Sequence, residues 1–124
     1  MIKVDEQYRK VVRTIEQPRF LVSEILLNAD TLTDQQRVAR ISQEIVNQLR
    51  NGVDFSGVAR QFSVSPTAAR GGQLGWVTLE QLDPALGSVL TKMEPGQIST
   101  PIAGQCRFYI LLLQTAKKAA PAML

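Results

Sequence analysis

Three features of the sequence could support chemistry: a carboxylate in an apolar stretch, a lone thiol and a glycine-rich turn. Glu24 lies within a largely apolar segment, where a carboxylate must be hydrogen-bonded, solvated or functional. Cys106 is the only cysteine, so an internal disulfide is ruled out. Three glycines within residues 71–75 precede the only tryptophan, Trp76. Because glycine tolerates positive φ and lets backbone or ligand come close, we interpret this turn as part of a site and not as a linker.

The lack of histidine excludes several classes of enzyme. Without histidine, a Ser-His-Asp or Cys-His catalytic arrangement and the usual zinc sites cannot form. We therefore expect no metal and no cofactor. Cys106 lies next to Arg107, but no histidine can act as its base, so we predict a packed thiol that is not a nucleophile. The net charge of +3 is modest and scattered, which argues against nucleic acid as a partner.

Length and composition indicate one folded domain. The chain has 124 residues, of which 44% are hydrophobic and 20% charged, as in ordinary soluble globular proteins. No apolar run approaches the length of a membrane span, and the first residues do not have the pattern of a signal peptide. Two alternatives stay open, a cytoplasmic protein or a piece of a longer exported one.

Residues 1–17 have the pattern of an amphipathic helix that stops before Pro18. Its apolar side chains are Val4, Tyr8, Val11, Val12 and Ile15. Such a helix cannot bury this face alone, so it either packs on the domain or forms an arm toward a neighbouring domain or partner. We divide the chain into a helix or linker arm (1–17), a folded domain (18–116) and a disordered tail (117–124).

A strand and two helices begin the folded domain. Residues 19–27 carry apolar side chains on both faces, which predicts a central strand. Thr33 and Gln36 form a capping box for a helix that runs to about Arg50. Its expected inward side chains are Val38, Ile41, Ile45 and Leu49. Asp54 caps a shorter helix. Its expected apolar stripe comprises Phe55, Val58, Ala59 and Phe62.

The glycine turn is followed by a short strand and another helix. The strand should place Leu74 and Trp76 on one face, with Trp76 as a plug of the sheet. Asp83 and Pro84 are the cap and first-turn proline of the helix. Its expected buried residues are Leu86, Val89 and Leu90.

The remaining segments predict a hairpin. Residues 94–97 suit a type II turn that leads into a strand near 98–102. After a further turn, residues 107–114 read as a strand buried on both faces. Together the elements predict an α+β domain with a small, mostly antiparallel sheet.

The stretch FSVSPTAARGGQLGW, with the later MEPGQISTPI, resembles the parvulin family of peptidyl-prolyl cis-trans isomerases. The resemblance covers residues 19–115 and is greatest for the periplasmic foldase and chaperone branch typified by SurA. It implies a parvulin-like, FKBP-like fold, in which a four-stranded sheet is surrounded by helices. It also implies rotamase activity on X-Pro bonds of unfolded or folding polypeptides in the periplasm, with outer-membrane proteins among the clients.

The same resemblance implies where substrate would bind. The slot for the proline ring falls on Leu74, Leu82 and Leu86, where parvulins often have Leu, Met and Phe. Residues 28–31 contain no basic cluster, so selectivity for phosphorylated Ser-Pro or Thr-Pro is not implied. We expect the isolated domain to be a monomer.

The polar edge of the implied site departs from the family pattern. Glu24 and Tyr109 occupy the two positions where parvulins usually have histidines. Ser65 replaces a cysteine or aspartate, and Cys106 replaces a hydroxyl residue. We expect the Tyr109 hydroxyl, or failing it the Ser65 hydroxyl, to hydrogen-bond Glu24. Two hypotheses follow: a parvulin-type isomerase with altered polar residues, or a catalytically weak module that binds prolyl peptides as a chaperone.

Overall fold

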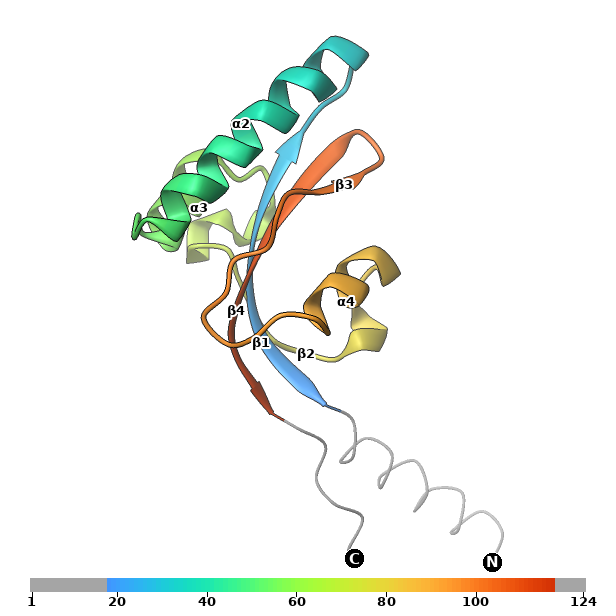
Figure 1. Cartoon of the computed structure of the whole chain (residues 1–124). Helices are drawn as coiled ribbons and strands as arrows, with labels where there is room; N and C mark the ends of the chain where they lie inside the picture. The colour runs from blue at the N-terminus through green and yellow to red at the C-terminus, as the bar shows by residue number, and fades with distance from the viewer. Residues whose placement is uncertain (1–17, 118–124) are drawn as a thin grey trace, which may run out of the picture.

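Two long antiparallel strands, β1 and β4, form the centre of a four-stranded sheet with the order β2-β1-β4-β3. The computed structural model describes residues 18–117 (Figure 1). Its elements are β1 (Arg19–Asn28), α2 (Leu32–Arg50), α3 (Phe55–Phe62), the 3-10 helix η1 (Pro66–Arg70), β2 (Gln73–Val77), the 3-10 helix η2 (Leu79–Gln81), α4 (Pro84–Leu90), β3 (Ile102–Gly104) and β4 (Arg107–Lys117). The helix expected at residues 1–17 lies outside the described residues, as do residues 118–124 of the expected tail.

Helices cover the sheet on both faces, α2 and α3 on one and α4 on the other (Figure 1). Because side chains alternate along a strand, β1 contributes to two cores. Ile25 and Leu27 pack with α2 and α3 in what we call the α2–α3 core. Phe20 and Val22 pack with α4 in the α4 core. The predicted α+β fold with a small antiparallel sheet is confirmed, and β1 is its central strand.

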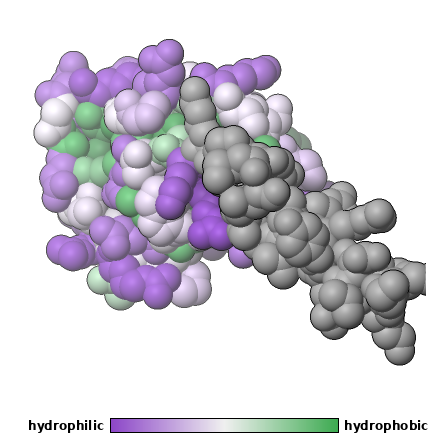
Figure 2. All heavy atoms as spheres, turned by 90° about the horizontal axis from the view of Figure 1, so that it is seen from below, coloured by the Kyte–Doolittle hydropathy of each residue, from purple (hydrophilic) through white to green (hydrophobic). Residues whose placement is uncertain are grey.

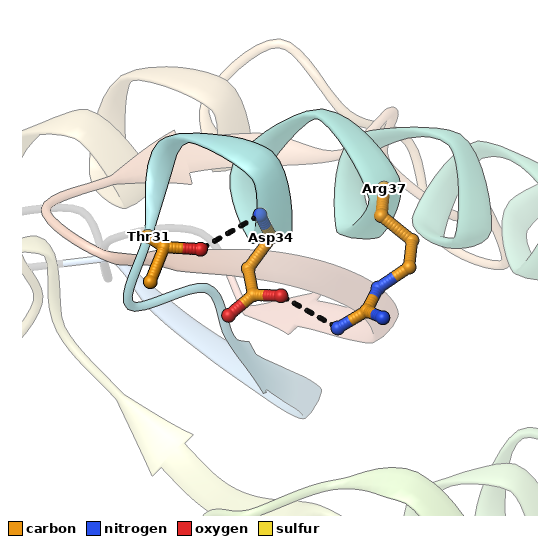
Figure 3. A network of polar contacts seen from close by, with 3 residues as sticks. All are labelled: Thr31, Asp34 and Arg37. Carbon is orange, nitrogen blue, oxygen red and sulfur yellow. Dashed lines mark hydrogen bonds and ion pairs between the residues drawn. The ribbon is translucent and has the colours of Figure 1, made fainter.

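The start of α2 is set by Thr31, whose hydroxyl accepts a hydrogen bond from the backbone N–H of Asp34 at 3.0 Å (Figure 3). Asp34 also accepts a hydrogen bond from the exposed guanidinium of Arg37 at 2.6 Å. The cap predicted at Thr33 is therefore wrong by two residues. Thr31 has the extended backbone that an N-cap needs, with φ −115° and ψ 163°, whereas Thr33 already lies inside the helix.

The buried face of α2 is rotated from the predicted one. Ile45 and Leu49 are buried as expected, but Ile41 is 42% exposed. Ser42 and Val46 are fully buried instead. Residues 42, 45, 46 and 49 have the i, i+3, i+4, i+7 spacing of one helix face, so one small polar residue is buried within an otherwise apolar stripe.

Aspartate caps begin the other two α-helices, as predicted. The Asp54 carboxylate accepts a hydrogen bond from the N–H of Gly57 at 3.2 Å and begins α3. The Asp83 carboxylate accepts one from the N–H of Ala85 at 2.9 Å and begins α4. Phe62, expected in the buried stripe of α3, is the last residue of that helix and is 49% exposed.

A bulge in β2 separates two side chains that we expected on one face. The register between β1 and β2 shifts beside Gly75, so that Leu74 is an extra residue on β2. Leu74 packs against the α4 core. Trp76 pairs with Leu21 and is 50% exposed, so the prediction that it plugs the sheet is wrong.

The last third of the chain follows the predicted order with shifted bounds. The type II turn predicted at residues 94–97 is confirmed, with a φ of 89° at Gly96 and a closing hydrogen bond of 3.0 Å. The strand predicted near 98–102 is displaced: Ile98 forms only an isolated bridge to β4, and β3 begins at Ile102. Pro101 has no N–H to donate to a ladder, which accounts for the gap between them. Lys117, expected in the tail, ends β4.

Hydrophilic side chains make up much of the surface seen along the sheet from below, with a smaller group of hydrophobic ones between them (Figure 2). The most exposed large hydrophobic residues are Leu32, Val64, Trp76, Phe62, Val53 and Ile41. Across residues 18–117, the helices are too short or too polar to span a bilayer.

Candidate active site

Glu24 is a buried carboxylate whose hydrogen-bond donors are hydroxyl groups. Its side chain projects from β1 and is 8% exposed. The Ser65 hydroxyl donates to Glu24 Oε2 at 2.6 Å, and the Thr67 hydroxyl donates to the same oxygen at 2.8 Å. The two hydroxyl oxygens lie 3.1 Å apart. A hydrogen bond to a charged group contributes about 1.5–3 kcal/mol, so the two bonds offset part of the cost of burying this carboxylate.

Backbone contacts hold the glycine turn and the preceding loop against β1. The N–H of Leu26 donates to Ser63 Oγ at 3.0 Å, and the N–H of Val64 donates to the Leu26 carbonyl at 2.8 Å. The N–H of Glu24 donates to the Gly72 carbonyl at 2.8 Å. Gly72 has φ +82°, and a Cβ there would lie 2.2 Å from the Glu24 carbonyl oxygen. Only glycine fits this approach, so the turn directly supports the residue that carries the carboxylate.

Of the two hydrogen bonds expected for Glu24, the one from Ser65 is confirmed and the one from Tyr109 is wrong. The Tyr109 hydroxyl instead accepts a hydrogen bond from Arg107 Nη1 at 3.2 Å. Tyr109 lies two residues nearer the β3–β4 turn than Leu111, the residue opposite Glu24. Its ring therefore reaches toward that turn.

Arg107 is an exposed cation at the start of β4. Its Nε donates to the Gln105 carbonyl at 3.2 Å, and its Nη1 donates to Tyr109. The hydrogen bond with Tyr109 and the Coulombic interaction with the same group raise the pKa of Arg107 above its usual value. Asp83, the N-cap of α4, makes a smaller contribution in the same direction. The guanidinium is therefore charged throughout the physiological pH range.

The three leucines expected in the proline slot all belong to the α4 core. Leu86 is 6% exposed, and Leu74 and Leu82 pack against the cluster while staying partly exposed. Tyr109 packs against the same cluster. Glu24 faces this side of the sheet too, since its partner across the β1–β4 ladder is Leu111 of the α4 core. The fold thus brings the leucines, the phenol and the carboxylate to one face of the sheet.

Cys106 lies apart from the carboxylate network. It is exposed and occupies the two-residue turn between β3 and β4, where its φ is 55°. The expectation of a packed thiol is wrong, because the strand begins only at Arg107 and the turn needs a residue at positive φ. The Cys106 carbonyl accepts a hydrogen bond from the N–H of Ala29 at 2.9 Å, which fixes the backbone of the turn against the end of β1.

Thr67 is the residue of this network that sequence reasoning missed. The available signal was its spacing from Ser65 across Pro66, which is typical of a turn in which a serine oxygen accepts the N–H two residues on. That bond is present, from the N–H of Thr67 to Ser65 Oγ at 3.3 Å. Within residues 18–117, no three His, Cys, Asp or Glu side chains are grouped so that they could hold a metal ion.

Comparisons with known proteins agree with this geometry. A family model of the PPIC-type PPIase (rotamase) domain matches residues 23–115. The chaperone SurA of Vibrio cholerae serotype O1 is 29% identical over 99 residues, which are 80% of this chain and 23% of that protein. The chain therefore spans less than a quarter of this curated relative.

Solved structures share the same architecture. The crystal structure of a PpiC-type peptidyl-prolyl cis-trans isomerase domain matches with a TM-score of 0.79 and 34% identity, covering 86% of this chain and 98% of that one. A second match is one of two SurA-like chaperones of Campylobacter jejuni, PEB4 and the periplasmic protein Cj1289. Its TM-score is 0.70 at 20% identity, covering 94% of this chain and 46% of that one, and this likeness concerns the fold alone.

Proposed function

Since the chain belongs to the family of PPIC-type peptidyl-prolyl isomerase domains, the parvulins, we propose that it catalyses the cis-trans isomerisation of X-Pro bonds in unfolded or folding polypeptides. The observation that carries this proposal is the arrangement on one face of the sheet. Apolar side chains of the α4 core lie on the same side as a buried carboxylate with two hydroxyl partners. We assign the isomerase domain to residues 18–116.

The reaction needs little covalent chemistry. Rotation about a peptide bond has a barrier of about 18–20 kcal/mol because amide resonance is lost. An X-Pro bond therefore takes about 10–100 s to isomerise unaided at 25 °C. The twisted amide has a smaller dipole than the planar one, so surroundings that replace water with apolar side chains favour the twisted state. The reaction moves no proton and requires no cofactor.

Each residue has a role in this proposal. Leu74, Leu82 and Leu86 bind the proline ring by apolar contact, and Leu86 is the most buried of the three. Ser65 and Glu24 form the polar edge beside the rotating bond. Tyr109 and Cys106 occupy positions that belong to the catalytic edge in the family. In this chain they lie toward the β3–β4 turn. In this proposal they border the substrate and do not contact the Glu24 carboxylate.

We further propose that the partners are proline-containing unfolded polypeptides, including outer-membrane proteins, and that the chain acts in the periplasm as a monomeric domain. SurA relatives named chaperones support a polypeptide partner. The resemblance of the sequence to the periplasmic foldase and chaperone branch supports the location.

An isomerisation assay on a short unphosphorylated X-Pro peptide, with NMR shift mapping of the same peptide, tests the activity. We expect acceleration of the cis-trans exchange, with shifts centred on Leu74 and Leu82. Leu82→Ala should reduce both the acceleration and the shifts. Val53→Ala is the control, because Val53 is 46% exposed in the segment between α2 and α3, the two helices that cover the face of the sheet opposite α4.

The outcomes separate the two hypotheses. Peptide binding without acceleration supports the weakly catalytic chaperone module and refutes the isomerase. If Leu82→Ala and Leu86→Ala leave peptide-induced shifts unchanged in folded protein, the proposed slot is in the wrong place. Because a buried apolar side chain contributes about 1.5–3 kcal/mol before the ordering costs of association, weak binding of short peptides is the expected result.

A further inference from the structure

The hydroxyl protons around Glu24 can be counted. An ionised carboxylate only accepts hydrogen bonds, and each hydroxyl has one proton to donate. The Ser65 hydroxyl is 2.6 Å from Glu24 Oε2, and the Thr67 hydroxyl is 2.8 Å from the same oxygen. Both protons are thus directed to the carboxylate. The Ser65 oxygen also accepts the N–H of Thr67 at 3.3 Å, which leaves it one lone pair and no proton.

The free lone pair on Ser65 depends on which acceptor Thr67 chooses. The Thr67 hydroxyl lies 3.1 Å from Ser65 Oγ and 2.8 Å from Glu24 Oε2. If it donated to Ser65, the Ser65 oxygen would accept two hydrogen bonds and keep no lone pair for a peptide. The shorter contact favours donation to Glu24, which leaves Ser65 one lone pair as an acceptor.

Hydroxyl donors are the side-chain partners that hold Glu24 in place. Titratable residues on the elements around Glu24 include Arg70 at the end of η1 and Tyr109 and Arg107 on β4. Across residues 18–117, no cation forms an ion pair with Glu24, and Tyr109 is occupied by Arg107. Ser65 and Thr67 are 9% and 7% exposed, so their hydroxyls sit beside the carboxylate with little competition from water.

We infer that Thr67 is a positioning residue, whose hydroxyl holds the Glu24 carboxylate so that Ser65 donates inward and presents an oxygen lone pair to the hydrogen-bond donors of a bound polypeptide. This inference rests on the proposed isomerase function of the same site. Thr67 acts through Glu24 and Ser65, and it does not touch the substrate. Thr67 is therefore a second support, beside Gly72, for Glu24, the residue at a position where parvulins usually have a histidine.

The test compares Thr67→Val, which keeps the shape but removes the hydroxyl, with Thr67→Ser, which keeps the hydroxyl. Thr91→Val is the control, since the Thr91 hydroxyl donates to the Ser88 carbonyl at the exposed end of α4. We expect Thr67→Val to lower kcat/KM for a short X-Pro peptide by about tenfold, Thr67→Ser to restore it, and Thr91→Val to leave it unchanged. In a Glu24→Met background, which has no acceptor oxygen for either hydroxyl, Thr67→Val should have no further effect.

Crystal structures of the two Thr67 variants give a second measurement that does not use activity. Thr67→Val should lose the 2.6 Å contact between Ser65 Oγ and Glu24 Oε2, and Thr67→Ser should keep it. A retained contact in Thr67→Val, a wild-type kcat/KM in that variant, or an equal loss in the Glu24→Met background would each overturn the inference. A wild-type chain without isomerase activity would refute the proposed function, and the crystal structures would then decide the role of Thr67 alone.

Discussion

Gly72 and Gly75 have almost the same φ but different surroundings, which makes them a matched pair for a test of the glycine turn. Their φ angles are +82° and +83°. A Cβ on Gly72 would lie 2.2 Å from the Glu24 carbonyl oxygen and 3.1 Å from the Ala59 Cβ, whereas a Cβ on Gly75 would have no atom within 4 Å. Alanine at either position is therefore strained by a positive φ, and only Gly72→Ala adds a collision with β1.

The two substitutions should differ by several kcal/mol in their effect on the free energy of unfolding. Left-handed backbone costs an alanine about 1–2 kcal/mol, which is the whole effect expected for Gly75→Ala. Gly72→Ala must also push the turn away from β1, for which overpacking suggests about 1–3 kcal/mol. Loss of the Glu24 N–H to Gly72 carbonyl bond adds about 1 kcal/mol. The expected total for Gly72→Ala is about 3–6 kcal/mol.

Urea and thermal unfolding of the two variants measure this difference. For a domain of this size, about 1 kcal/mol corresponds to a fall in Tm of roughly 4–8 °C, so Gly75→Ala should remain well folded at 25 °C. Gly72→Ala should lose a large part of the roughly 5–15 kcal/mol that small domains have in all, so its unfolding midpoint should lie well below that of Gly75→Ala. Equal losses of stability in the two variants would refute the close approach of the turn to β1.

Three further predictions test individual contacts. Thr31→Ala should destabilise the fold by about 1 kcal/mol, the typical value of an N-cap, whereas Thr33→Ala should change stability by less than about 0.5 kcal/mol; chemical denaturation that gives the reverse order would restore the capping box predicted from sequence. Glu24→Met and Ser65→Ala should show a coupling energy of about 1.5–3 kcal/mol in a double-mutant cycle of unfolding free energies, and additive losses would contradict the 2.6 Å contact. Cys106→Ser should keep peptide binding and isomerase activity near the wild-type level in the same assays, and a folded but inactive variant would show that the exposed thiol takes part.

Local signals explain why most elements could be predicted from the sequence. Asp54 and Asp83 can each satisfy a free N–H at a helix start, and both do so. Each signal depends on a few neighbouring residues and on nothing distant. Thr31 and Thr33 show the limit, since both are suitable caps and the choice depends on where β1 ends, which is set by its pairing with β4.

Features that depend on register could not be predicted in the same way. The bulge beside Gly75 sends Leu74 and Trp76 to opposite faces, although their spacing in the sequence matches a regular strand. Tyr109 lies opposite Leu26 and not opposite Glu24 because of the β1–β4 register, and its hydroxyl bonds Arg107 on the same strand. A one-residue slip of a ladder would move every side chain of the strand to the other face, and the local sequence does not show which register forms.

The candidate site was predicted only through the family resemblance, and its details come from the structure. The strand pattern showed that Glu24 needed a partner, and the Ser65 alternative was correct. Thr67 was missed because two residues in a loop gave no period from which a direction could be inferred. Its contact with Glu24 joins positions 43 residues apart in the chain.

Arg19 and Lys117 are paired directly across β1 and β4, so the chain enters and leaves the sheet at one place (Figure 1). A polypeptide that continued from both residues would carry the domain at its side. The folded domain would then add almost nothing to the end-to-end length of that polypeptide. Tension along such a polypeptide would load the Arg19–Lys117 pair first and open the β1–β4 ladder one pair at a time, because the two strands are pulled apart from the same end. Strand separation would thus begin at Arg19 and Lys117. It would reach Glu24, which lies five residues further along β1, only later.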